Sequence, residues 1–263
     1  MTNSIQEKNT ASIRFVGIIP ARYASTRFPG KPLAMIGDRT MIQRVYEQVS
    51  KALSDVYVAT DDKRIFNEII RFGGKAIMTS DQHKSGTDRC YEAFTKLDKP
   101  FDVIINIQGD EPFIQPEQIT TLQTCFENKE TEIATLAKYF TEKDEFEALN
   151  NPNSPKLVLN KRNEALYFSR SIIPYKRGTE PQKWISEHNY LKHVGIYAYR
   201  ADVLKELTEL EQSSLEMAES LEQLRWLENG YRIKVGITDV ETIGIDTPED
   251  LEKVKNLFLD PFF

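Results

Sequence analysis

The chain has few of the residues that build metal–sulfur, disulfide or covalent catalytic sites. Its 263 residues include two cysteines and three histidines. Cys90 and Cys125 lie far apart without metal-ligand spacing, so the sequence predicts neither a disulfide framework nor a zinc site. The motifs G-x-S-x-G and H-E-x-x-H are missing, and no lysine has a cofactor context. Covalent catalysis is therefore not indicated.

Long apolar runs and an excess of positive charge are missing too. No apolar run approaches the roughly 20 residues that span a bilayer, and the first ten residues, MTNSIQEKNT, lack the apolar centre of a signal peptide. We therefore expect a soluble, cytoplasmic protein with no membrane partner. The net charge of −6 argues against nucleic acid as a partner, because phosphate backbones select basic proteins.

Strand-like and helix-like segments alternate through the first half of the chain. Short apolar or β-branched segments predict strands over 15–19, 56–60, 76–79 and 103–107. Amphipathic segments predict helices over 41–53, 63–72 and 87–97. This order predicts an α/β, Rossmann-like fold with a mostly parallel sheet covered by helices on both faces. Ligands of such sheets bind outside the carboxyl ends of the strands.

The second half breaks this alternation. Strands are predicted over 133–139, 156–160, 165–169, 194–199 and 233–237, and helices over 201–210, 215–229 and the C-terminus. We interpret residues 140–200 as an inserted mixed β lobe within a domain that covers 13–263. Residues 1–12 are expected to form a disordered N-terminal extension.

Residues 14–37 hold the most informative motif. Arg22, Arg27 and Lys31 follow a predicted strand, and no Asp or Glu occurs from residue 8 to residue 37. Arginine offers a fork of donors for phosphate oxygens, and lysine a compact point charge. The loop therefore indicates a polyphosphate-binding site, and a solvated basic loop is the alternative.

This loop is not a Walker A P-loop, which needs G-x-x-x-x-G-K-[ST]. Ser25 stands where the first glycine should be, and Pro32 follows the lysine. Because proline disfavours helical geometry at the residue before it, we expect that Lys31 does not begin a helix as it does in a P-loop.

Two distant aspartates are candidates for a cation site. Asp110 follows the apolar run VIINIQ, and a carboxylate at that sheet edge is a typical ligand for Mg²⁺ on nucleotide phosphates. A cap before Pro112 is the alternative for Asp110. Thr247 and Asp250 already form a capping arrangement, which leaves Asp246 available, although a plain helix start also explains this segment.

Further candidates have strong structural alternatives. The segment 85–89, SGTDR, places small and hydroxyl residues at a helix start, where unpaired N–H groups bind anions or bases, but a plain N-cap fits equally. Arg170 and His193 at strand ends suit a carboxylate, although a lone histidine is more often structural. Glu222 and Gln223 suit sugar hydroxyls, although both also fit the polar face of a helix.

Taken in order, these motifs resemble the 3-deoxy-manno-octulosonate (Kdo) cytidylyltransferase family. The resemblance runs from about residue 14 to 256 and rests on IIPARYASTRFPGKPL, ATDD, SGTDR, NIQGDEP, ALYFSR, HVGIY, LEQLR and GIDTPEDL. It implies a nucleotide-diphospho-sugar transferase type of fold. It also implies transfer of CMP from CTP to the anomeric hydroxyl of Kdo for lipopolysaccharide biosynthesis, with pyrophosphate release. A homodimer is implied as well, with the lobe in sugar binding and dimerisation.

The resemblance also implies roles for individual residues. The implied CTP-binding residues are Ala21, Arg22, Arg27, Lys31, Ser85, Gly86 and Asp110. The implied sugar-binding residues are Arg27, Gln108, Arg170, His193, Tyr197, Glu222 and Gln223. Asp110 and Asp246 match the magnesium ligands. The catalytic residues would be Arg22, Lys31, Asp110 and Asp246.

Three alternatives stay open from the sequence. A cytidylyltransferase for another keto-acid sugar, such as sialic acid or 8-amino-Kdo, would keep the cationic loop and both aspartates. A nucleotidyltransferase that acts on a sugar 1-phosphate is the second. The third is a catalytically silent nucleotide-binding protein, and the presence of Lys31, Asp110 and Asp246 counts against it.

Overall fold

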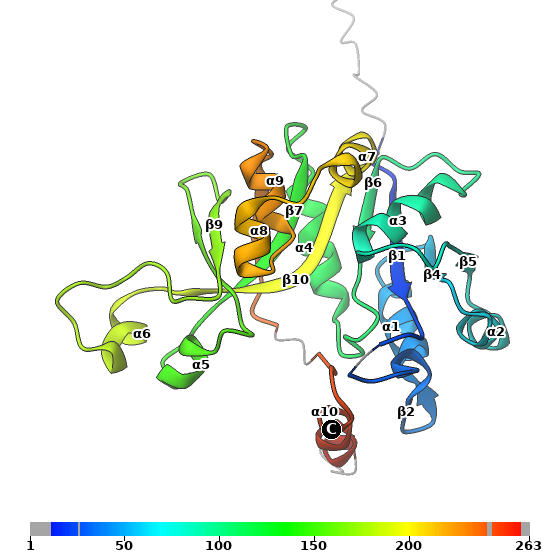
Figure 1. The fold of residues 1–263 in the computed structure, drawn as a ribbon, viewed down its shortest axis with the longest axis horizontal. Coiled ribbons are helices and arrows are strands. Elements are labelled where there is room, and N and C mark those ends of the chain that lie inside the picture. The colour runs from blue at the N-terminus through cyan, green and yellow to red at the C-terminus, as the bar shows by residue number, and fades with distance from the viewer. Residues whose placement is uncertain (1–11, 26, 241–243, 259–263) are drawn as a thin grey trace, which may run out of the picture.

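A twisted sheet forms the centre of the molecule. The computed structural model describes residues 12–25, 27–240 and 244–258, so most of the predicted N-terminal extension lies outside the described residues. The main path of the sheet follows the order β11-β7-β10-β6-β1-β4-β5, of which Figure 1 labels the strands from β7 to β5. Their bounds are β1 Phe15–Ala21, β4 Val56–Thr60, β5 Ala76–Met78, β6 Val103–Asn106, β7 Ile133–Tyr139, β10 Leu191–Arg200 and β11 Ile233–Ile237.

The sheet is mostly parallel, as predicted. Strand β1 pairs in parallel with β4 and β6, β4 with β5, and β7 with β11. Strand β10 alone in this path is antiparallel, to both β6 and β7. The carboxyl ends of β1, β4 and β6 therefore meet at one edge, which is where a ligand of such a sheet binds.

Helices cover both faces of the sheet, which confirms the predicted α/β class. One face carries α1 (Met41–Ser50), α2 (Lys63–Arg71) and α4 (Pro116–Cys125), and the other carries α3 (Gly86–Thr95), α7 (Ala201–Glu209) and α9 (Gln223–Glu228). Helix α4 was not predicted, although Pro116 stands at its first position and the Gln118 side chain accepts from the Gln115 N–H at 3.0 Å. No helix in the described part of the chain is long and apolar enough to cross a membrane.

The predicted mixed β lobe extends to one side of the sheet (Figure 1). It contains β8 (Lys156–Leu159), β9 (Ala165–Ser169), α5 (Phe146–Asn150), the short η2 (Pro181–Lys183) and α6 (Trp184–Glu187). Its small core includes Phe140, Leu149, Trp184 and Tyr190. Strand β10 joins lobe and sheet, because its first residues pair with β8 and its last residues pair with β6.

One predicted helix is wrong: residues 215–229 form two helices. Helix α8 (Ser214–Glu219) ends at Ser220, which takes the left-handed conformation with φ of +51°. The Glu219 carboxylate accepts hydrogen bonds from Ser169 Oγ at 2.7 Å and from the Arg170 backbone N–H at 2.9 Å. Contacts with β9, which periodicity does not encode, therefore accompany the break before α9.

Candidate active site

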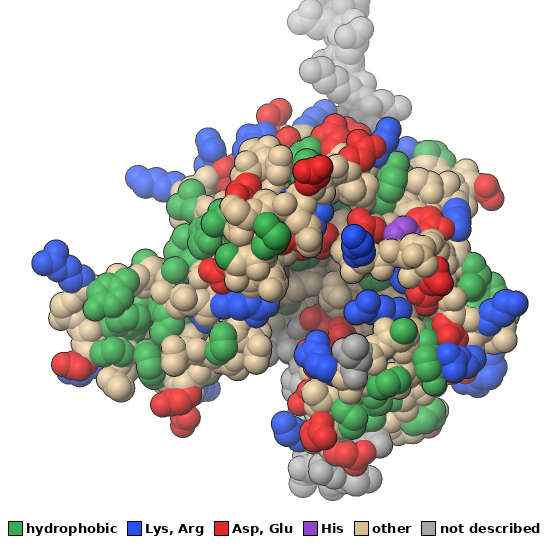
Figure 2. Space-filling view, viewed as in Figure 1, with side chains coloured by type: hydrophobic (Ala, Val, Ile, Leu, Met, Phe, Trp, Pro, Cys, Tyr) green, Lys and Arg blue, Asp and Glu red, His purple; other side chains and the backbone are tan. Residues whose placement is uncertain are grey.

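A cavity of about 240 Å³ lies at the carboxyl ends of β1 and β6. Figure 2 shows acidic and basic side chains gathered around a hollow in the face that it displays. The cavity is lined by nine residues singled out from the sequence: Ala21, Arg22, Arg27, Lys31, Ser85, Gly86, Gln108, Asp110 and Asp246. The cationic loop therefore lines the same cavity as both aspartates, which is the arrangement expected for a polyphosphate with a bound metal ion.

The cationic loop is held in shape by Tyr23 and Gly30. Gly30 has φ of +71°, and its N–H donates to the Tyr23 carbonyl at 2.9 Å. A Cβ at Gly30 would lie 3.0 Å from the Tyr23 ring. The Arg64 guanidinium lies 3.3 Å from the centroid of the same ring. Lys31 then begins a single 3₁₀ turn, η1 (Lys31–Leu33), which contains Pro32, and no α-helix begins at the lysine, as predicted.

Replacing Gly30 by Ala should destabilise the loop and weaken the binding of CTP, the substrate that the resemblance implies. A left-handed φ costs a non-glycine residue about 1–2 kcal/mol, and the added methyl group would push against Tyr23. We expect the KM for CTP to rise several-fold in steady-state assays. Gly178→Ala is the matched control, because Gly178 has φ of +82° with no atom near its missing Cβ. An unchanged KM in Gly30→Ala would contradict this role of the loop.

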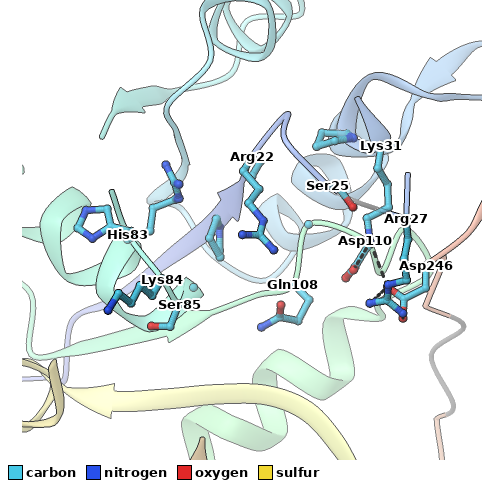
Figure 3. A pocket seen from close by; sticks show the side chains of 16 residues that line it. Arg22, Ser25, Arg27, Lys31, His83, Lys84, Ser85, Gln108, Asp110 and Asp246 are labelled. Carbon is cyan, nitrogen blue, oxygen red and sulfur yellow. Dashed lines mark hydrogen bonds and ion pairs between the residues drawn. The ribbon is translucent and has the colours of Figure 1, made fainter. Parts of the chain in front are cut away.

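At one end of the cavity, two carboxylates converge on one ammonium group (Figure 3). Lys31 Nζ lies 2.6 Å from Asp110 Oδ2 and 3.2 Å from Asp246 Oδ1. The Arg27 guanidinium donates to both oxygens of Asp246 at 3.2 and 3.4 Å. Gly109 lets the segment before Asp110 lie close to the end of β1, because a Cβ at Gly109 would lie 2.9 Å from the Pro20 carbonyl oxygen.

The segment before α10 (Pro248–Phe258) brings Asp246 to this end. The Ile245 N–H donates to the Asp110 carbonyl at 3.0 Å. Thr247 and Asp250 cap each other's backbone N–H groups at 3.2 Å, which confirms the predicted capping arrangement. Because Asp250 supplies the cap, the Asp246 carboxylate is available to Lys31 and Arg27.

The oxygen donors at this end suit Mg²⁺. Asp110 and Asp246 each place an oxygen within hydrogen-bond distance of the same nitrogen, so both carboxylates point at a common position that a cation already occupies. Among the described residues, no group of three or more His, Cys, Asp or Glu side chains is placed to hold a metal ion. Two carboxylates suit magnesium that completes its shell with water and phosphate oxygens.

The other end of the cavity is formed by the first turn of α3 and the residues before it (Figure 3). The Ser85 hydroxyl caps the helix by accepting from the Asp88 N–H at 3.1 Å, and the Asp88 carboxylate accepts from the Ser85 N–H. His83 lies against Glu92. Burial opposes ionisation of Glu92, but hydrogen bonds from Lys96, the Ser80 backbone and His83 lower the pKa of its carboxyl to about 2.

A buried arginine also lines the cavity at this end. Arg89 is 3% exposed and donates to Thr79 Oγ1 at 2.6 Å and to Asp61 Oδ2 at 2.7 Å. It thereby ties α3 to the residues that follow β4 and β5. Arg89, His83 and Lys84 were not predicted as cavity residues, although the sequence has a basic pair directly before SGTDR and an arginine within it.

Comparison with known proteins agrees with this geometry. Residues 16–235 match the sequence profile of a cytidylyltransferase family. The 3-deoxy-manno-octulosonate cytidylyltransferase of Parabacteroides distasonis is 68% identical over 92% of this chain and 96% of that protein. The chain belongs to the 3-deoxy-manno-octulosonate cytidylyltransferase family. The enzyme of that name from Bacteroides thetaiotaomicron is 66% identical over 91% of this chain and 96% of that protein.

A solved structure supports both the fold and the family of this chain. A CMP:2-keto-3-deoxy-manno-octonic acid synthetase complexed with CTP superposes with a TM-score of 0.85. It is 44% identical and covers 94% of this chain and 98% of its own. A cytidylyltransferase from Leptospira borgpetersenii, 16% identical with a TM-score of 0.62 over 96% of this chain and 88% of its own, shares the fold alone.

In this cytidylyltransferase, Glu222 lies next to the start of α3 but outside the first cavity. Its carboxylate accepts from Thr87 Oγ1 at 2.8 Å, and burial raises the pKa of Glu222. Glu222 lines a second cavity of about 660 Å³, which shares Lys84 and Ser85 with the first. This predicted sugar-binding residue therefore lines the neighbouring cavity and not the one that the cationic loop lines.

His193, Tyr197 and Gln223 do not line the first cavity. His193 Nε2 lies 3.0 Å from Thr135 Oγ1, and its ring contacts Tyr197 at a centroid distance of 5.4 Å. Tyr197 is 8% exposed and Gln223 is 4% exposed. Gln223 is thus buried at the start of α9, so the alternative of a solvated helix face is wrong for it. Their sugar-binding role stays a prediction.

His193 should make the stability of this cytidylyltransferase depend on pH. Burial lowers the pKa of His193 to about 4 from 6.5. Between these two pH values the unfolded chain binds more protons than the folded one. The contribution of neutral, buried His193 to stability is therefore complete above pH 6.5 and is lost as the pH drops toward 4. At about pH 5 the loss should reach about 2 kcal/mol. Urea unfolding at about pH 7.5 and pH 5 measures it, and His193→Gln should abolish this component.

His188→Gln supplies the control for that measurement, because it removes an exposed imidazole and leaves His193 in place. An equal pH dependence in wild type and His193→Gln would contradict the assignment.

Arg170 is held by the backbone. Its Nε, Nη1 and Nη2 donate to the carbonyls of Glu219, Pro152 and Ser220 at 2.6, 2.9 and 3.2 Å. Arg170 lines neither cavity. A guanidinium has five N–H donors, so two remain for the sugar carboxylate that the sequence analysis assigned to it. That assignment also stays a prediction.

Proposed function

We propose that this chain transfers CMP from CTP to the anomeric hydroxyl of Kdo and releases pyrophosphate. The observation that carries the proposal is the cavity in which Arg22, Arg27 and Lys31 face Asp110 and Asp246. A relative of 44% identity, titled as the synthetase complexed with CTP, supports the nucleotide. The names of the curated relatives support Kdo as the acceptor over a sialic acid or a sugar 1-phosphate.

The chain contributes positioning and electrostatics rather than a nucleophile. Cys90 is fully buried, and burial raises the pKa of its thiol. The sugar hydroxyl itself attacks the α-phosphorus of CTP, opposite the departing pyrophosphate. Arg22, Arg27 and Lys31 neutralise the charge that develops on the leaving group, and pre-placed cations of this kind lower the barrier without reorganisation.

Asp110 and Asp246 would hold the Mg²⁺ that accompanies the nucleotide. When bound, Mg²⁺ supplies charge neutralisation at the phosphates and lowers the pKa of an attacking hydroxyl. At the opposite end, Ser85 and Gly86 expose the first turn of α3, which suits the cytidine. Gln108 lies between the two ends of the cavity (Figure 3) and would contact the sugar.

A pyrophosphate-release assay with CTP, Kdo and Mg²⁺ tests this function. We expect release with CTP and Kdo. Sialic acid, 8-amino-Kdo and a sugar 1-phosphate as acceptors test the alternative enzymes. Release with a sugar 1-phosphate but not with Kdo would overturn the acceptor, and no release with any acceptor would favour a silent nucleotide-binding protein.

The homodimer stays a prediction. The lobe exposes large apolar side chains, with Leu166 59% exposed, Tyr175 76% exposed and Tyr139, at the end of β7, 41% exposed. Apolar side chains gathered on one lobe are typical of a protein–protein contact, which supports the proposed role of this lobe in dimerisation.

A further inference from the structure

Lys31 occupies the position at which the two predicted metal ligands converge. Its ammonium bonds Asp110 at 2.6 Å and Asp246 at 3.2 Å, and its side chain is 16% exposed. The same lysine is the one expected to contact the phosphates of CTP. One ammonium group cannot hold both carboxylates at these distances while a cation takes the same oxygens, so the protein must exchange one contact for the other.

The charges around this position balance in the nucleotide-free protein. Arg27 and Lys31 contribute two positive charges, and Asp110 and Asp246 contribute two negative charges. A bare divalent cation therefore meets a neutral cluster and would have to displace an ammonium group at hydrogen-bond distance. Mg²⁺ bound to a nucleoside triphosphate differs, because the phosphates bring negative charge for Lys31 and oxygens for the metal.

We propose that Lys31 is a stand-in cation, which holds Asp110 and Asp246 together in the free protein and suppresses metal binding until a nucleotide arrives. The metal then enters together with the nucleoside triphosphate, and Lys31 moves from the carboxylates to the phosphates. This inference rests on the proposed metal-dependent function and adds the order in which the metal and the nucleotide bind.

The fold explains how Lys31 can hold this position. Gly30 and the 3₁₀ turn place Lys31 at the edge of the cavity, and the Ile245 N–H bond to Asp110 places Asp246 opposite it. The lysine is also the contact that neutralises both carboxylates at once. Without it, two like charges would lie close together in a partly enclosed cavity, which is unfavourable.

Mn²⁺ binding to the nucleotide-free protein tests the proposal without turnover. Electron paramagnetic resonance measures the concentration of free Mn²⁺ at each point of the titration. We expect Lys31→Met to bind Mn²⁺ at least about tenfold more tightly than wild type, because the substitution leaves a net negative cluster. Adding Asp110→Asn to Lys31→Met should abolish the gain.

Lys84→Met is the matched control. It removes the same charge from the same cavity but at the opposite end (Figure 3), so Mn²⁺ affinity should stay near that of wild type. Lys31→Arg keeps the charge and should also resemble wild type. Circular dichroism checks that each variant is folded, and Lys31→Gln replaces Lys31→Met should the latter fail to fold.

Two results would overturn the proposal. One is an affinity of Lys31→Met for Mn²⁺ no higher than that of wild type. The other is an equal gain in Lys84→Met, which would assign the effect to general charge. Since no reaction is measured, these outcomes are separate from the pyrophosphate-release assay: wild type could turn over CTP and Kdo while Lys31 plays no such part.

Discussion

Asp110→Asn should lower turnover with CTP and Kdo by at least about 100-fold while leaving the protein folded. The substitution removes the carboxylate at 2.6 Å from Lys31, which is one of the two carboxylates assigned to Mg²⁺. Asn keeps the size of the side chain, and Asp110 is a partly exposed loop residue, so packing should change little. Pyrophosphate release at saturating substrates measures the loss, and urea unfolding measures stability.

Asp102→Asn is the control for that experiment. Asp102 pairs with Arg14 at the amino end of the sheet, and its side chain is 39% exposed. This variant carries the same change of charge far from the cavity and should keep near-wild-type turnover. If Asp110→Asn were also near wild type at saturating Mg²⁺, the assignment of Asp110 to the metal would be wrong.

Asp61→Asn should cost about 3 kcal/mol of stability, because it leaves the buried charge of Arg89 without its carboxylate. The side chain of Arg89 is 4% exposed and that of Asp61 is 16% exposed. Loosening Arg89 also loosens α3 against β4 and β5, where Ser85 and Gly86 line the cavity. We therefore expect the KM for CTP to rise on the order of tenfold. Urea unfolding and steady-state kinetics measure the two effects.

A second substitution distinguishes the unpaired charge of Arg89 from a general disruption of the fold. Arg89→Met in the Asp61→Asn background removes the unpaired charge and should recover part of the lost stability, as the coupling of a buried pair predicts. Asp102→Asn serves again as the exposed control and should cost less than about 1 kcal/mol. Equal stability losses in Asp61→Asn and Asp102→Asn would contradict the burial argument.

Local patterns in the sequence predicted many of the residues that line the cavity. Strand periodicity placed Arg22 and Gln108 at the carboxyl ends of β1 and β6, and the structure puts both in one cavity. The capping pair Thr247 and Asp250 left Asp246 available, and its carboxylate is used by Lys31. These predictions succeed because caps and strand ends depend on residues a few positions apart.

The same patterns failed where tertiary contacts override them. Residues 215–229 have continuous helical periodicity, but Ser220 interrupts the helix where Glu219 bonds to β9. Arg89 looked like one more residue of a helix start, and only the folded chain brings Asp61 and Thr79 to it. Burial of Gln223 and the contact of His193 with Thr135 likewise depend on packing that periodicity does not describe.

By itself, the sequence determined the α/β class, the cationic loop and its two partner aspartates, and the family. Only the tertiary structure decided that Lys31 bonds both aspartates, at sequence separations of 79 and 215 residues. It also decided that Arg170 is held by backbone carbonyls. The physical reason is range: periodicity and caps act within one element, whereas charge pairing and burial depend on which distant elements the sheet brings together.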